Sequence, residues 1–269
     1  MAKAKVKDIE LCYEVHGQGE PLLLIAGLGY ASWSWFCQVE RLAKNYRTIV
    51  FDNRGVGESD KPDVPYTIPM LADDAAGLLA SLDIPAAHVL GVSMGGFVAQ
   101  ELALRHPGMV KSLVLGCTSF GGPNSIPITE TALNSMLNVQ GLTPEGVIRQ
   151  GFRVALSESF HAGNPEVIDL MVGWRLEKPT PRYAWERQFV AATTFNTESR
   201  LSRINVPVLV ITGADDLVIP ARNSELLAAG IPGAGLVNMP GGGHLFFIEQ
   251  AGEFNRQVLE FLGSVPTRK

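Results

Sequence analysis

Apolar residues occur along this chain in short continuous runs, and segments with a helical spacing separate the runs. A strand covered by helices on both faces is apolar at nearly every position. Such runs predict buried strands at Pro21 to Ala26, Arg47 to Asp52, Val89 to Val92, Lys111 to Cys117 and Val206 to Gly213. Val6 to Val15 alternates loosely and predicts a further strand, and Leu236 to Met239 predicts a short last one. Strands that alternate with helices indicate an α/β fold.

Helical patterns connect these strands. Between Pro69 and Leu82, apolar residues recur on one helix face, so Asp73 and Asp74 are expected on the solvated face. The segment from Met94 to about Arg105 is apolar nearly all round, which is typical of a buried helix. Two more helices are predicted, one between Pro220 and Gly230 and one with an apolar face made by Phe254, Val258, Phe261 and Leu262.

The middle of the chain follows a different pattern. Gly121 to Asn124 breaks the alternation, and from about Thr129 to Thr194 helical spacings occur without a convincing strand. We therefore expect one core, formed by residues 1–120 and 201–269, and a helical cap formed by residues 121–200. Most aromatic side chains of the cap are expected to form its own core. Those expected to contact a substrate are Trp174, Trp185 and Phe189.

Composition narrows the classes of partner and compartment. The 269 residues carry a net charge of −5 with no basic block, so nucleic acid is not an expected partner. The three cysteines, at positions 12, 37 and 117, have no metal-binding spacing and favour a reduced, cytoplasmic compartment. Near the N-terminus the longest apolar run, Pro21 to Leu28, is too short to span a bilayer, and no signal-peptide pattern precedes it. We expect no membrane association, and a homo-oligomer is possible.

The segment Gly91-Val92-Ser93-Met94-Gly95 stands between a predicted strand and a predicted helix. A strand that turns into a helix on one residue forces that residue into a strained conformation, and small neighbours make room for it. This context is typical of a nucleophile elbow, with Ser93 as nucleophile and the Met94 amide as an oxyanion donor. The alternative is a glycine-rich turn with a solvated serine.

Two other glycine-containing loops follow predicted strands. Ala26-Gly27-Leu28-Gly29 favours a second oxyanion donor, the Leu28 amide, although a tight turn between strand and helix is the alternative. The loop from Asp52 to Asp60 lacks the Gly-Lys-Ser/Thr ending of a phosphate-binding loop. It is expected to be structural, with Arg54 pairing locally.

An acid and a histidine follow the last two predicted strands. Asp215 and Asp216 come after one strand, and His244 comes after the next, behind three glycines. Catalytic groups of open α/β sheets gather at the carboxyl ends of strands. Histidine can take the proton of an attacking serine, and a carboxylate can orient the imidazole. From these residues alone, either aspartate can be the acid.

These motifs together resemble the α/β-hydrolase superfamily, in the branch of small esterases, lactonases and carbon–carbon bond hydrolases. Asp52-x-Arg54-Gly55-x-Gly57-x-Ser59 is a further match. The resemblance implies a mostly parallel, doubly wound sheet with a helical cap inserted after the sixth strand. The family pattern G-x-x-D-x-x-x-P matches Gly213, Asp216 and Pro220, which implies that Asp216 is the acid. One departure is Ala26, where many relatives carry a histidine.

The sequence therefore predicts a serine hydrolase that cleaves a small carboxylic ester or lactone through an acyl-enzyme. The expected catalytic residues are Ser93, Asp216 and His244, without a metal or a cofactor. Carbon–carbon bond hydrolysis, perhydrolysis or ligand binding without catalysis are the alternatives on the same residues. An anionic substrate is left open by the cap arginines Arg149, Arg153, Arg175, Arg182 and Arg187.

Overall fold

The computed structural model describes residues 1–266, and within them the strands form one eight-stranded sheet with the order β1-β2-β4-β3-β5-β6-β7-β8. The six strands β4, β3, β5, β6, β7 and β8 are parallel to one another, whereas β2 is antiparallel to both of its neighbours, β1 and β4. The strands are β1 (Ala2–Val6), β2 (Ile9–His16), β3 (Glu20–Ile25), β4 (Tyr46–Phe51), β5 (Ala87–Val92), β6 (Val110–Gly116), β7 (Val208–Gly213) and β8 (Gly235–Met239). The expected mostly parallel α/β sheet is confirmed.

The first predicted strand, Val6 to Val15, is in fact parts of two. Lys7 has a φ of 51°, and the chain reverses there, so that β1 and β2 form an antiparallel hairpin. The loose alternation of this segment did not reveal the turn.

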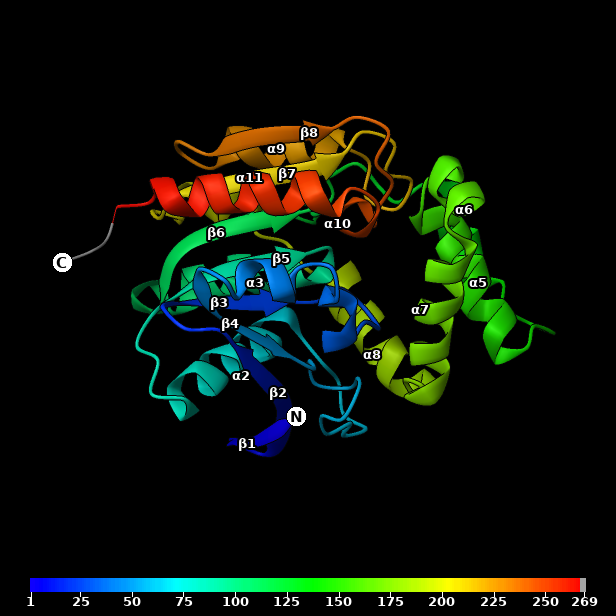
Figure 1. Ribbon diagram of the computed structural model, residues 1–269, viewed down its shortest axis with the longest axis horizontal. Helices are drawn as coiled ribbons and strands as arrows, with labels where there is room; N and C mark the ends of the chain where they lie inside the picture. Colours follow the sequence, from blue (N-terminus) through cyan, green and yellow to red (C-terminus); the bar gives the residue numbers. More distant parts are fainter. Residues whose placement is uncertain (267–269) are drawn as a thin grey trace.

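Helices cover both faces of the sheet (Figure 1). One face is packed by α2, α3 and α9, and the other by α1, α10 and α11. Their bounds are α1 (Val39–Leu42), α2 (Ile68–Ser81), α3 (Met94–Arg105), α9 (Arg222–Gly230), α10 (Phe246–Glu249) and α11 (Ala251–Ser264). Within residues 1–266, none of the helices has both the length and the apolar character that crossing a membrane requires.

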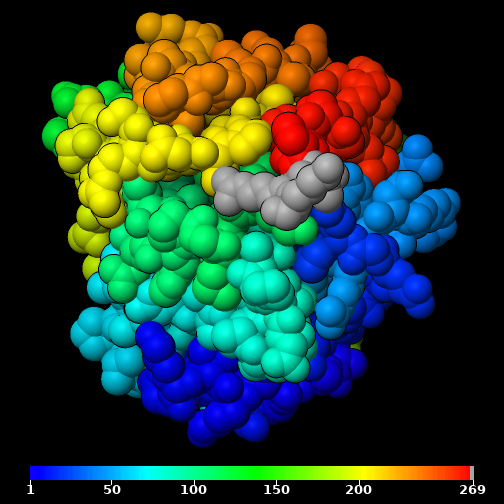
Figure 2. All heavy atoms as spheres, turned by 90° about the vertical axis from the view of Figure 1, so that its left-hand side faces the viewer, coloured from blue at the N-terminus to red at the C-terminus, as the bar shows by residue number. Residues whose placement is uncertain are grey.

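Strand β3 illustrates why the central strands are continuously apolar. Leu23 and Ile25 lie in the core beneath α2 and α3, whereas Leu22 and Leu24 lie in the core on the opposite face. Successive side chains of a strand point to opposite faces, so a central strand fills two cores at once. Figure 2 shows the blue N-terminal residues at one end of the molecule and the orange segment that contains β8 at the opposite end, in agreement with the places of β1 and β8 at the two edges of the sheet.

The cap is formed by helices between β6 and β7, and it lies at one end of the sheet, on the right in Figure 1. Three of these helices begin at a Thr or Ser whose side chain accepts a hydrogen bond from a backbone amide in the first turn, at residues 129, 143 and 157. The cap helices are α4 (Glu130–Leu137), α5 (Pro144–Ala155), α6 (Glu158–Gly163), α7 (Pro165–Glu177) and α8 (Arg182–Thr193).

The solvated position expected for Asp74 is wrong, and so is local pairing of Arg54. Both side chains are 2% exposed, and the guanidinium bonds the Asp74 carboxylate through Nε at 2.8 Å and Nη2 at 2.9 Å. Arg54 also bonds Asp8 at 3.2 Å. This buried pair fixes the loop after β4 to α2, which is why one of two adjacent aspartates leaves the solvated face.

Candidate active site

Ser93 occupies the single residue between β5 and α3. Its φ of 54° and ψ of −125° lie in a region that non-glycine residues rarely adopt, as the elbow motif predicts. A β-carbon at Gly91 would overlap the Gly95 carbonyl oxygen, and one at Gly95 would overlap the carbonyl of Ile25. The turn is possible because only glycine lets the helix approach the two strands this closely.

His244 is hydrogen bonded to Asp216. The distance from His244 Nδ1 to Asp216 Oδ2 is 2.7 Å, and the two residues are 7% and 5% exposed. The other carboxylate oxygen, Asp216 Oδ1, accepts from the amides of Val218 and Ile219 at 2.8 Å each. These bonds fix the carboxylate, which in turn orients the imidazole. The second ring nitrogen, Nε2, is not engaged by Asp216. Asp215 is exposed, so the acid that contacts the histidine is Asp216.

Ser93 and His244 line the same cavity, which has a volume of about 700 Å³. In the part of the chain that the structure describes, no hydrogen bond joins the Ser93 hydroxyl to the imidazole. Such bonds are often long without substrate and tighten when it binds. The arrangement therefore brings a hydroxyl and a carboxylate-bound imidazole into the lining of one cavity.

The turn after β3 lies against Ser93. A β-carbon at Gly27 would sit 3.1 Å from Ser93 Cβ, and the Tyr30 amide donates to the Gly27 carbonyl at 3.2 Å to close the turn. Leu28 and Met94 both line the cavity. Met94 is the first residue of α3, and an amide at that position has no partner within the helix. Two backbone amides beside the same serine can stabilise a developing negative charge.

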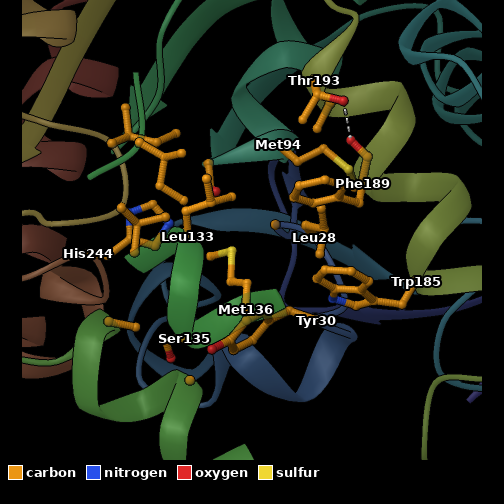
Figure 3. Close-up of a pocket in the computed structure, with 18 of the residues that line it drawn as sticks. Leu28, Tyr30, Met94, Leu133, Ser135, Met136, Trp185, Phe189, Thr193 and His244 are labelled. Carbon is orange, nitrogen blue, oxygen red and sulfur yellow. Dashed lines mark hydrogen bonds between the residues drawn. The ribbon is translucent and has the colours of Figure 1, made fainter. Parts of the chain in front are cut away.

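Cap residues close the cavity from two sides (Figure 3). Trp185 and Phe189 reach in from α8 and stack on each other with ring centroids 5.1 Å apart. Leu133 and Met136 of α4 lie across from them. Trp185 and Phe189 thus line the cavity, and their contact with a substrate stays a prediction.

The third expected contact, Trp174, lies elsewhere. Its ring packs against Trp33 at 5.6 Å and against Phe36 at 5.1 Å, where α7 meets the core, and it does not line the described cavity. Its position gives no support to a role in substrate binding, because the face of α7 that carries it is turned toward core aromatics.

Of the five cap arginines named above, Arg175 combines a place in the cavity lining with the lack of an acid partner within residues 1–266, whereas Arg153 does not line the cavity. Arg175 lines the cavity with its guanidinium carbon 5.1 Å from the centroid of the Tyr30 ring. Among the described residues, no carboxylate lies within ion-pair distance of it. Acids pair with Arg149, Arg182 and Arg187. Burial raises the pKa of the Tyr30 hydroxyl, so the ring stays neutral beneath the cation.

Most of the chain matches one known protein family. A profile of the alpha/beta hydrolase fold matches residues 20–251. The chain belongs to the α/β-hydrolase family. The family resemblance inferred from the elbow, the acid and the histidine is confirmed.

Relatives of this α/β-hydrolase have several assigned activities. RutD of Azorhizobium caulinodans, assigned as a carbamate hydrolase, is 30% identical over 96% of this chain and 97% of its own. BpoC of Mycobacterium tuberculosis, assigned as a non-heme bromoperoxidase, is 34% identical over 96% of this chain and 99% of its own. The crystal structure of the enol-lactonase from Burkholderia xenovorans LB400 matches with a TM-score of 0.88 and 27% identity, over 98% of this chain and 100% of the other. Together they support a hydrolase.

Sequence reasoning missed two polar residues that connect the cap of this α/β-hydrolase to its site. Gln188 of α8 is fully buried and bonds backbone groups of the core. It shares the buried face of α8 with Ala184 and Ala191, so a polar residue on an otherwise small, apolar helix face was the available signal.

Glu249 is the second of these residues. Its carboxylate accepts from the Ser157 hydroxyl at 2.5 Å, the Ser157 amide at 3.2 Å and the Gly243 amide at 3.2 Å. It therefore ties the start of α6 to the residue before His244. Burial raises the pKa of the Glu249 carboxyl, although the hydrogen bonds from Ser157 oppose this shift.

Replacing Glu249 by glutamine is expected to change how stability depends on pH. Because burial raises the pKa of Glu249 above its value in the unfolded chain, ionisation of this carboxyl weakens the wild-type fold as the pH rises. The free energy of unfolding of Glu249→Gln minus that of wild type is therefore expected to increase between about pH 4 and pH 7. Urea denaturation across this range measures it. Any hydrogen bond lost in the variant adds an offset that does not vary with pH, so a flat or falling difference contradicts the assignment.

Proposed function

We propose that this α/β-hydrolase is a serine hydrolase that cleaves a small carboxylic ester or lactone. The proposal rests on the hydrogen bond between His244 Nδ1 and Asp216 Oδ2. His244 lines the same cavity as Ser93, whose backbone is strained. A carboxylate that fixes the imidazole in one tautomer leaves Nε2 free to act as a base. The enol-lactonase and the assigned carbamate hydrolase among its relatives support acyl chemistry.

The reaction follows from these groups. Ser93 Oγ attacks the acyl carbon, and His244 Nε2 takes the hydroxyl proton and passes it to the leaving oxygen. The bond between the acyl carbon and the leaving oxygen breaks, and an acyl-enzyme on Ser93 remains. Water then attacks the acyl carbon, again giving its proton to His244, and releases the acid and the free serine. Asp216 stabilises the imidazolium in both steps.

The amides of Leu28 and Met94 serve as the oxyanion donors in this proposal. Each such donor contributes on the order of 3 kcal/mol to the transition state. Both are backbone groups, so the absence of a histidine at Ala26 does not remove them. The proposal includes a cytoplasmic location, which the free thiols of Cys12, Cys37 and Cys117 support.

A second candidate is perhydrolysis on the same three residues, which the similarity to BpoC favours. In that reaction hydrogen peroxide replaces water as the attacking group and a peracid leaves. Peracid formation from acetate and hydrogen peroxide, compared with ester hydrolysis by the same preparation, distinguishes the two activities.

Replacing Ser93 by alanine tests the proposed function. The wild-type protein is expected to hydrolyse p-nitrophenyl acetate, and Ser93→Ala is expected to lower kcat by about 10³- to 10⁶-fold, because the nucleophile is lost. Ser135→Ala changes another serine on the cavity wall and is the control. Turnover that persists unchanged in Ser93→Ala excludes this serine as the nucleophile, and a wild-type protein that binds esters without turnover supports a receptor instead.

The surroundings of Arg175 support a narrower substrate class, namely an ester or lactone whose acyl part carries a carboxylate. A guanidinium in a largely apolar cavity, without an acid beside it, can form a charge-assisted pair with a bound anion. A β-carbon at Gly29 would lie 3.8 Å from Arg175 Nη2, so the cation is close to the turn that carries the Leu28 amide. We therefore propose that the anion is carried by the acyl part, which contains the reacting carbonyl.

The Arg175→Ala variant tests this class with a pair of matched esters. The value of kcat/KM for p-nitrophenyl hemisuccinate is expected to fall about 10- to 100-fold, because one charge-assisted hydrogen bond is lost. For neutral p-nitrophenyl butyrate the change is expected to stay within about 3-fold. Arg182→Ala is the control, since Arg182 also lines the cavity but is paired with Glu186. Equal losses on the two esters would mean that Arg175 does not recognise a carboxylate.

A further inference from the structure

Gln188 connects the cap to two loops of the core. Its side chain is fully buried, with Oε1 accepting from the Gly29 amide at 2.9 Å and Nε2 donating to the Arg54 carbonyl at 2.8 Å. Both hydrogen-bonding ends of the side chain amide are thus engaged with core backbone. A buried amide with both ends bonded has one orientation, so it holds the two backbone groups that it bonds in fixed positions relative to each other.

The Gly29 amide belongs to the turn that carries the Leu28 amide. The Tyr30 amide bonds the Gly27 carbonyl, so Leu28 and Gly29 are the two central residues of the turn. Gly29 has a φ of +72°, which is typical of the second central residue of a type II turn. The peptide between the two central residues can rotate in such a turn, and its N–H is the one that Gln188 holds.

A second contact from α8 limits the same rotation. A β-carbon at Gly29 would lie 3.0 Å from Trp185 Cδ1, so the indole covers this residue. At its other end, Gln188 bonds a loop that the buried ion pair between Arg54 and Asp74 holds in place. Helix α8 therefore fixes the turn against a rigid part of the core.

We propose that Gln188 is a positioning residue through which the cap sets the direction of the Leu28 amide. The inference rests on the proposed function, in which that amide is an oxyanion donor. The Leu28 N–H lies in the preceding peptide, which shares Leu28 Cα with the peptide that Gln188 holds. Loss of the bond to Gln188 frees ψ at Leu28 and φ at Gly29, so the turn can shift as a whole and carry the Leu28 N–H away from the oxyanion. The cap thereby completes half of the oxyanion site, besides enclosing the substrate.

Two variants separate the hydrogen bonds from packing. Gln188→Met keeps an unbranched side chain of similar length and loses both bonds. Gln188→Glu keeps an acceptor for the Gly29 amide. Tyr183→Phe is the matched control, because it removes a different hydrogen bond between α8 and the core. In that bond the Tyr183 hydroxyl donates to the Lys61 carbonyl at 2.7 Å, and Lys61 is distant in sequence from the turn at Gly27 to Tyr30. For each protein, kcat and KM are measured with p-nitrophenyl butyrate, together with the affinities for butyl boronic acid and for butyrate and with the thermal unfolding midpoint.

Gln188→Met is expected to lower kcat about 10- to 100-fold, less than the loss of a whole oxyanion donor, with KM within about 3-fold of wild type. Binding of the boronic acid, which forms a tetrahedral adduct, is expected to weaken by the same factor as kcat/KM, whereas butyrate binding is unchanged. Gln188→Glu is expected to retain more of kcat than Gln188→Met. Tyr183→Phe is expected to match wild type in every catalytic measurement.

Several results would overturn the inference. Normal kcat in Gln188→Met, a change in KM alone, or a lower unfolding midpoint with unchanged boronic acid affinity would reduce Gln188 to a structural role. If Gln188→Met does not fold, Gln188→Glu is compared with wild type, with the same factor expected for kcat/KM and boronic acid affinity, and unequal factors reject the proposal. If the wild-type protein shows no turnover, or if its turnover survives in Ser93→Ala, the proposed function fails as well. If only the inference on Gln188 fails, turnover still depends on Ser93.

Discussion

The close approach of helix α3 to strands β3 and β5 is the constraint on which the rest of the site depends. Gly91 and Gly95 allow this approach, and the chain can then turn from strand to helix on Ser93 alone. The strain in the backbone of that residue is held by the buried residues on either side of it, in β5 and in the first turns of α3. The same geometry lifts the hydroxyl from the end of the sheet and leaves the first amide of α3 beside it.

The cap is attached to this site by polar contacts as well as by its apolar core. Gln188 bonds the turn after β3, and Glu249 bonds both the start of α6 and the residue before His244. Each contact joins the cap to a loop that carries a proposed catalytic group. A cap that is linked in this way cannot move freely without disturbing those loops, which is consistent with a cavity formed by both parts of the chain.

Much of the fold and the residues of the candidate site could be predicted from the sequence. Central strands fill two cores, so they leave continuous apolar runs, and the elbow needs glycines at fixed positions. The motif resemblance selected Asp216, which the structure pairs with His244. What could not be predicted depends on contacts between distant segments: Asp74 looked solvated because its partner, Arg54, lies 20 residues earlier in the chain. The packing of Trp174 against core aromatics and the bonds of Gln188 to the core could not be predicted for a similar reason, since helical spacing does not reveal which face meets the core.

The central claim is that Ser93, His244 and Asp216 act together on an acyl carbon beside the Leu28 and Met94 amides. A crystal structure of the protein after reaction with ethyl p-nitrophenyl methylphosphonate tests it most directly. The account predicts a bond between phosphorus and Ser93 Oγ, with the phosphoryl oxygen about 2.7–3.1 Å from both amide nitrogens and His244 Nε2 facing the adduct. Phosphorus bonded to a different residue, or a phosphoryl oxygen directed away from both amides, would contradict it.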